Sequence, residues 1–277
     1  MLKSISRHAL LASVGATVAG VLVATAVSAA TFTVSALVVD PLTPYANPGW
    51  VKFERGSGVV KIGADYGAPA GFGSSALVLD TPLNGDKAQA FKSVVADGVG
   101  VPLASVASLS YWAYRSSAST ASPLQAPALN IEIDTNGLAN PGGFATLVYE
   151  PVYNNGGTPY PQNTWTLNDA YIGGSAIWWS TKQIPGVPSA FSSFVPWSAI
   201  VAANPDAVVL RYGINQGSGN PGLFAAADGF TFNGATNDFE AFNPTKDDCK
   251  DGGWATKWAS GTFKNQGACV SYFARRD

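Results

Sequence analysis

The sequence predicts a mainly β protein: an antiparallel β-sandwich with one short helix and a small disulfide-closed C-terminal segment. Three observations predict this fold. Short runs of apolar, β-branched and aromatic residues recur between turns rich in glycine and proline. Only 12% of the residues are charged, which leaves little material for amphipathic helices. With 47% apolar residues and eight tryptophans, the chain has enough material to bury a core.

The first 29 residues have the features of an export signal. Lys3 and Arg7 give a positive start, an apolar run follows, and small residues at 28–30 provide a cleavage site. An uncleaved anchor is the alternative, because the run approaches the ~20 residues that span a bilayer. Its many small residues favour cleavage, and no later segment is long and apolar enough to cross a membrane. We therefore predict a secreted protein with no transmembrane segment in the mature chain.

Removal of this signal would limit the available chemistry. The single histidine, His8, would be lost, which excludes histidine-based catalytic triads and histidine-ligated zinc sites. The loss of Lys3 and Arg7 would leave 14 basic against 18 acidic residues. A mildly acidic chain is a poor partner for nucleic acid, because binding phosphates requires clustered lysine and arginine.

The sandwich is predicted to occupy residues 30–243. Runs with strand character are 31–39, 58–63, 75–80, 108–115, 128–134, 144–152, 176–181, 207–215 and 229–234. In the run 108–115, period-two alternation places Tyr111 on one face and Trp112 on the other. A helix is predicted to begin near Pro196 and to end at Asn204-Pro205. Three Asn-Pro-Gly tripeptides, at 47–49, 140–142 and 220–222, are predicted type II turns with a positive φ at glycine.

The remaining residues, 244–277, contain the chain's two cysteines, Cys249 and Cys269. In an exported chain such a pair predicts a disulfide, and this one would close a loop of about 20 residues that contributes about 3 kcal/mol. Aromatic residues that could pack around it are Trp254, Trp258, Phe263 and Tyr272. A stapled structural cap is the simplest interpretation, and an aromatic binding surface or a tether to the cell surface are the alternatives.

The C-terminal stretch NPTKDDCKDGGWATKW…GTFKNQGACVSYF resembles a segment common among exported bacterial proteins of unassigned function. The stretches PALNIEID, LVYEPVYN, WWSTK and GINQGSGNPGL resemble domains of the same kind of protein. These resemblances imply a bacterial exported protein and a jelly-roll-like sandwich, and they imply no activity.

The stretch NIEIDTNG is the clearest candidate for catalysis. It resembles the Glu-x-Asp-x-(x)-Glu strand of family 16 glycoside hydrolases, which are jelly-roll enzymes. Glu132 and Asp134 match the first two carboxylates, but Asn136 or Gly137 stands where the third is needed. A retaining glycosidase requires two carboxyl groups about 5 Å apart. Glu150 could replace the missing acid only if strand register brought it close, so we predict no catalytic residue.

The same stretch has two further interpretations. Asp134 and Asn136 could be oxygen ligands at the start of a calcium loop in which Gly137 provides the bend. More simply, Asp-x-Asn-Gly is favourable turn chemistry between two strands. A structural calcium ion is therefore the one cofactor that the sequence leaves open.

Aromatic and amide side chains provide candidate ligand-binding residues. Trp178 and Trp179 are adjacent in a predicted strand, so they should point to opposite faces unless both faces are covered. The predicted aromatic platform consists of Tyr153, Tyr160, Trp165, Trp178 and Trp179. Asn215, Gln216 and Asn220 could bond to sugar hydroxyls. The alternatives are that a loop buries both tryptophans and that the nearby glycines only permit a tight connection.

These observations predict an exported, non-catalytic binding or surface-interaction protein, with polysaccharide or a cell-surface glycan as its partner. One alternative is a glycoside hydrolase of jelly-roll type that uses carboxylates. The other is a purely structural protein of the envelope or matrix, in which all the aromatic residues belong to the core.

Overall fold

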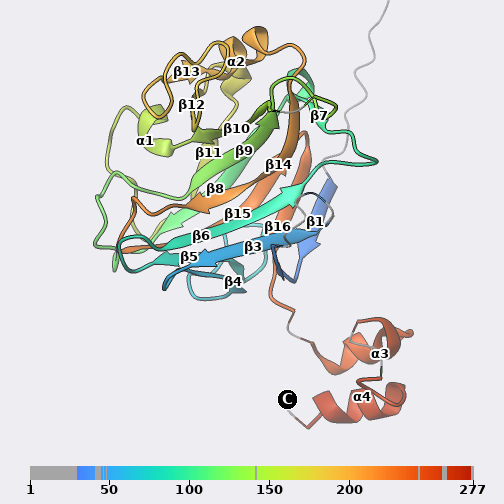
Figure 1. The fold of residues 1–277 in the computed structure, drawn as a ribbon. Helices are drawn as coiled ribbons and strands as arrows, with labels where there is room; N and C mark the ends of the chain where they lie inside the picture. The colour runs from blue at the N-terminus through green and yellow to red at the C-terminus, as the bar shows by residue number, and fades with distance from the viewer. Residues whose placement is uncertain are drawn as a thin grey trace, which may run out of the picture.

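The computed structural model describes residues 30–40, 45, 47, 49–140, 142–242, 244–257 and 261–275. The predicted export signal and Trp258 lie outside the described residues. The described part is mainly β, with two sheets that pack as a sandwich (Figure 1). The predicted fold class is therefore confirmed. No helix in this part of the chain is long and apolar enough to span a bilayer.

One sheet has seven strands and is organised around the long strand β15 (Leu223–Phe232). One edge of β15 pairs with β8, and the other pairs first with β5 and then with β16. The other strands of this sheet are β1 (Ala30–Val34), β4 (Val59–Gly63), β5 (Ala76–Thr81), β8 (Leu109–Arg115), β11 (Thr166–Asp169) and β16 (Ala235–Phe239).

The second sheet has nine strands, in the order β13-β12-β10-β9-β14-β6-β3-β2, with β7 beside β14. Their bounds are β2 (Val38–Val39), β3 (Trp50–Arg55), β6 (Lys87–Ser93), β7 (Val101–Pro102), β9 (Ala128–Asp134), β10 (Phe144–Tyr149), β12 (Ile177–Ser180), β13 (Val195–Pro196) and β14 (Val208–Gln216). Pairing is antiparallel except between β1 and β16 and between β2 and β3 in the described residues.

The core lies between the two sheets and is rich in aromatic rings. Tyr212 of the nine-stranded sheet stacks on Phe230 and Phe232 of the other sheet, with ring centroids 4.9 and 4.5 Å apart. Trp178 is fully buried and packs at 5.1 Å against Trp197 at the start of α2 (Trp197–Ala203). The predicted helix is thus confirmed, and its tryptophan closes one end of the core.

Two short helical elements, η1 (Leu103–Ser105) and η2 (Ile172–Gly174), and the helix α1 (Pro151–Asn154) lie in connections of the sandwich. The C-terminal segment consists of η3 (Lys246–Cys249), α3 (Gly253–Thr256) and α4 (Gln266–Phe273), which Figure 1 shows apart from the sandwich. The predicted disulfide between Cys249 and Cys269 is present. Trp254 and Phe263 pack around it, and Phe263 also contacts Tyr272.

Two of the three predicted type II turns have the expected glycine conformation. Gly142 has a φ of 96° and Gly222 has a φ of 74°. Gly49 does not adopt a positive φ. There the chain bends instead, with the Gly49 N–H donating to Asn47 Oδ1 at 2.8 Å, and β3 begins at the next residue, Trp50.

Candidate functional site

The outer face of the nine-stranded sheet carries a row of polar and aromatic side chains. Along β6, Ala88 and Ala90 point into the core, so Lys87, Gln89 and Phe91 point outward. On the other strands the outward residues that line the site are Phe53 of β3, Asn215 and Arg211 of β14, Asn130 and Glu132 of β9, and Thr146 of β10. Four amide or hydroxyl side chains on this face therefore adjoin the buried ring of Phe91 and the exposed ring of Phe53.

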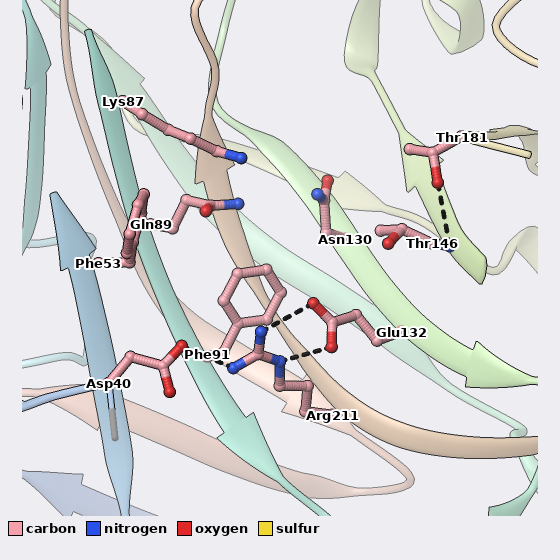
Figure 2. Close-up of a pocket in the computed structure, with 10 residues that line it drawn as sticks. All are labelled: Asp40, Phe53, Lys87, Gln89, Phe91, Asn130, Glu132, Thr146, Thr181 and Arg211. Atoms are coloured by element: carbon pink, nitrogen blue, oxygen red, sulfur yellow. Dashed lines mark hydrogen bonds and ion pairs between the residues drawn. The ribbon is translucent and has the colours of Figure 1, made fainter. Parts of the chain in front are cut away.

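A hollow of about 390 Å³ lies at the middle of this face, and we call it the central hollow. Strand register places Gly213 between Phe91 and Asn130, so no side chain fills the space above it. A Cβ at position 213 would collide with the carbonyl oxygen of Ala90, which makes glycine necessary there. The residues that line the central hollow are Asp40, Phe53, Lys87, Gln89, Phe91, Asn130, Glu132, Thr146, Thr181 and Arg211 (Figure 2).

Charges in the central hollow are organised around Arg211. Its guanidinium donates two hydrogen bonds to Glu132, from Nε at 2.6 Å and from Nη2 at 2.9 Å. It donates a third, from Nη1, to Asp40 at 2.9 Å (Figure 2). Burial opposes the charge of Arg211, but the bonds to Glu132 and Asp40 outweigh it and raise the pKa of the guanidinium. Arg211 therefore lies between two carboxylates and holds both.

A second hollow, of about 360 Å³, adjoins the first and shares Lys87, Asn130 and Thr181 with it. We call it the aromatic hollow, because Trp179 and Phe191 form one wall with ring centroids 5.5 Å apart. The two hollows together form the groove. Its far rim is the connection 217–220 between β14 and β15.

Glu150 lies at the base of the aromatic hollow. The indole Nε1 of Trp179 donates to Glu150 Oε2 at 2.9 Å, which fixes the plane of the indole ring. Burial raises the pKa of the Glu150 carboxyl, and the bond from Trp179 partly offsets that rise. The carboxylate thus serves first to orient an aromatic ring at the groove.

Phe191 is held in a strained conformation with its ring exposed. Its φ is 60°, a region that bulky side chains rarely adopt, and 64% of its surface is exposed. Its backbone N–H donates to Ser180 O at 3.0 Å, which attaches the residue to the end of β12. Strain at an exposed aromatic residue is a feature of functional sites, because packing alone would not select it.

Five predicted ligand-binding residues have clear placements relative to the groove. Trp179 and Asn215 line it, as does Asn220. Trp178 and Gln216 do not, and the structure corrects their assignment. Each is on the inner face of its strand and fully buried. Trp178 Nε1 donates to Ala170 O, and Gln216 Nε2 donates to Thr81 Oγ1 and Leu223 O.

Three other predicted aromatic residues lie elsewhere. Trp165 packs on Tyr114 at 5.5 Å, on the outer face of the seven-stranded sheet. Tyr160 is nearly buried and accepts a hydrogen bond from Asn168 beside a separate hollow of about 360 Å³. Tyr153 is exposed in α1 and packs on Phe194 at 4.2 Å. The five predicted aromatic residues therefore do not form one platform.

The candidate calcium ligands lie at the turn that follows β9. The backbone N–H of Asn136 donates to Asp134 Oδ1 at 3.1 Å, as in a turn stabilised by its own side chain. The side-chain oxygens of Asp134 and Asn136 both lie beside Gly143, so these two oxygens could share a cation. Among the described residues, no group of three or more acidic, histidine or cysteine side chains could hold a metal ion.

The carboxylates do not reproduce a glycosidase pair. Glu132 is paired with Thr146 across β9 and β10, and Glu150 lies four residues further along. At about 3.3 Å per residue, this separates the two backbone positions by about 13 Å. Glycosidases of either stereochemistry need carboxyl groups within about 5–9.5 Å. The register therefore does not make Glu150 the missing acid.

Several groove residues were not predicted from the sequence, namely Phe53, Lys87, Gln89, Asn130 and Phe191. The alternation Lys-Ala-Gln-Ala-Phe in residues 87–91 is a signal that could have revealed a strand with a polar outer face. No local signal marks Phe191, because its role depends on the ring of Trp179.

No family model matches the chain, and no curated protein matches it. Two solved structures are similar over part of their length. One is a GH51 α-L-arabinofuranosidase with bound arabinose, at 12% identity and a TM-score of 0.36, over 65% of this chain and 22% of that one. The other is the enzymatically active domain of tailspike protein 4 from bacteriophage CBA120, at 15% identity and a TM-score of 0.33, over 69% and 20%. The aligned part is about a fifth of each protein, and both similarities are too distant to indicate a function.

Proposed function

We propose that the protein is an exported, non-catalytic carbohydrate-binding protein and that the groove is its binding site. The observation that carries the proposal is the placement of aromatic rings at both ends of one groove with amides and charges between them. Phe53 lies at one end, and Trp179 with Phe191 lies at the other. Sugar rings have C–H faces that pack on aromatic rings, and their hydroxyls bond to amide and charged groups.

The dimensions of the groove suit an oligosaccharide. Phe53 is on β3 and Trp179 is on β12, and four strands lie between them. At about 4.8 Å per strand, the two rings are about 24 Å apart across the sheet. A glycan chain of several units that crosses the strands would contact both ends and the polar row between them.

The charged groups favour binding over hydrolysis. Arg211 lies between Asp40 and Glu132 and donates hydrogen bonds to both, so these carboxylates do not face a common reacting bond. Glu150 is engaged by Trp179 and lies well along the sheet from Glu132. A glycosidase needs a pair of carboxyl groups on either side of the scissile bond.

The disulfide supports the proposed location outside the cytoplasm. The Cys249–Cys269 bridge uses both cysteines of the chain, and such bridges persist in oxidising compartments. A small segment that depends on a bridge for stability is typical of exported proteins.

Binding of soluble polysaccharides, measured by affinity electrophoresis on the full chain, tests the proposal. We expect retardation in at least one polysaccharide gel. Affinity should fall about tenfold in Trp179→Ala and in Phe191→Ala, because each removes a ring from the groove. Trp165→Ala is the matched control, since that ring lies on the opposite sheet. No retardation by any polysaccharide, or full affinity in a Trp179→Ala, Phe191→Ala double variant, would refute the proposal.

A further inference from the structure

The central hollow presents hydrogen-bond donors to one space. Figure 2 shows the amine of Lys87 and the amide nitrogens of Gln89 and Asn130 directed into the space beside one another. Gly213, between Phe91 and Asn130, leaves the floor of this space free of a side chain. A cluster of nitrogen donors around an open floor is suited to oxygen atoms that carry negative charge.

Lys87 is a cation of this cluster that forms no ion pair with a carboxylate in the described residues, although the charge of Glu132 favours its charged form. Arg211 is bound to Glu132 and Asp40, so its charge is compensated. Lys87 makes no hydrogen bond and no ion pair within the described part of the chain, although it lines both hollows. Arg55, which lies directly opposite Lys87 on β3, adds a second positive charge on this side of the groove.

The surroundings of Lys87 make an unpaired charge costly. The side chain is half-buried, and burial together with the charge of Arg55 lowers the pKa of its amine. The neighbouring Asn130 is 6% exposed, and its Oδ1 has no hydrogen-bond partner in the described residues. This oxygen is an acceptor, so a sugar hydroxyl beside the anionic group could donate to it, while the amide nitrogen of Asn130 remains a donor for the anionic group.

We propose that the central hollow binds an anionic substituent, a carboxylate or a sulfate, on the glycan, and that Lys87 pairs with it. This inference rests on the proposed function, because it assigns the class of glycan that the groove selects. The aromatic rings at the two ends hold the sugar backbone, and the donors over Gly213 select units that carry a negative group.

The test compares matched pairs of polysaccharides by titration calorimetry on the full chain. Polygalacturonate and its methyl-esterified form differ in carboxylates, and dextran sulfate and dextran differ in sulfates. We expect the charged member of one pair to bind at least about tenfold more tightly than its neutral counterpart. The pair that shows the preference identifies the anionic group. The preference should weaken as sodium chloride is raised, because salt screens the ion pair.

Lys87→Met should abolish the preference, so that the charged and the neutral polymer of each pair bind with equal affinity. Lys61→Met is the matched control, because Lys61 lies on β4 of the opposite sheet and pairs with Asp65. The melting temperature should not fall in Lys87→Met, since the variant removes an unpaired half-buried charge.

Three outcomes separate this inference from the proposed function. Equal affinity for the charged and neutral polymers, with sensitivity to Trp179→Ala, would overturn the anionic site and leave the proposed function intact. A charge preference that persists in Lys87→Met would also overturn the assignment. If the protein binds none of the four polymers and no other polysaccharide, both the proposed function and this inference are refuted.

Discussion

Arg211 and Glu132 form a two-point ion pair that joins neighbouring strands on the face of the groove. Nε of Arg211 donates to Oε2 at 2.6 Å, and Nη2 donates to Oε1 at 2.9 Å. The guanidinium also lies over the ring of Phe91, 4.6 Å from its centroid, and bonds to Asp40. The pair thus connects β9, β14, β6 and the segment before β3. Glu132, the first candidate for catalysis in the sequence, is a residue that holds the floor of the groove in place.

Glu132→Gln should therefore reduce stability. The variant leaves Arg211 partly buried with only Asp40 as an ionic partner, and we expect the free energy of unfolding to fall by about 1–3 kcal/mol. Urea unfolding followed by tryptophan fluorescence measures the change. Asp40→Asn is the comparison and should cost less, because Asp40 makes a single bond to Arg211 and is more exposed. Equal stability of Glu132→Gln and the parent protein would contradict this account.

Replacement of Phe191 by glycine and by alanine should give different stabilities but the same loss of glycan binding. Its φ of 60° is unfavourable for any residue with a Cβ, by about 1–2 kcal/mol. Phe191→Gly and Phe191→Ala both remove the ring from Trp179, but only glycine relieves the backbone strain. We expect the glycine variant to be about 1 kcal/mol more stable than the alanine variant in thermal unfolding, and both to lose glycan binding equally. If alanine is the more stable of the two, the strain is not real.

Calcium removal should leave the stability of the sandwich unchanged. Calcium takes about six to eight oxygen ligands, and the turn after β9 brings together two side-chain oxygens in its described residues, those of Asp134 and Asn136. We expect the same melting temperature with EDTA and with added calcium chloride. A higher melting temperature in calcium that is lost in Asp134→Asn would establish the metal site instead.

Two of the strands that were not predicted from the sequence carry much of the groove. Runs such as 128–134 and 207–215 were predicted as strands because they are rich in β-branched and aromatic residues. β3 (Trp50–Arg55) and β6 (Lys87–Ser93) were missed. Their outer faces carry lysine, glutamine and arginine. These residues make the site polar, and they also interrupt the apolar and β-branched pattern from which strands are predicted.

Other properties of the site depend on register, which a single sequence does not contain. Period two predicted that Trp178 and Trp179 point to opposite faces, but not which of them enters the core. Glu132 and Arg211 are 79 residues apart in the chain and meet only because β9 pairs with β14. Trp165 was grouped with the groove, but β11 joins the other sheet, and that depends on strand order.

The stability of the C-terminal segment should depend on its disulfide, and the stability of the sandwich should not. Cys249, Cys269 and Phe273 form the small buried cluster on which η3, α3 and α4 pack. Removal of the bridge in a Cys249→Ser, Cys269→Ser variant should cost the segment about 3 kcal/mol, more than so small a core can supply. Limited proteolysis should then cleave after residue 244, with the melting temperature of the sandwich unchanged. A fall in that melting temperature would show that the segment stabilises the sandwich.

Stability should decrease with rising pH because of Asp228. This carboxyl is fully buried in β15, and burial raises its pKa from 3.8 to about 8, although the backbone N–H groups of Phe239 and Gly229 donate to it. The nearby charges of Asp238 and Glu240 act in the same direction as burial. Between about pH 4 and pH 8 the unfolded chain loses this proton and the folded chain retains it. The raised pKa therefore lowers stability progressively across that window, with no effect below it.

Asp228→Asn isolates this effect, because asparagine keeps the acceptor for both N–H groups and cannot ionise. Each pKa unit corresponds to about 1.4 kcal/mol, so the variant should exceed the parent protein by several kcal/mol above pH 8 and differ little near pH 4. Urea unfolding at a series of pH values measures the difference. Asp238→Asn is the control. The Asp238 carboxyl is less buried than that of Asp228, and burial and the charge of Glu240 raise its pKa by less. A difference between Asp228→Asn and the parent that is constant with pH would mean that Asp228 is ionised in the folded protein throughout the range.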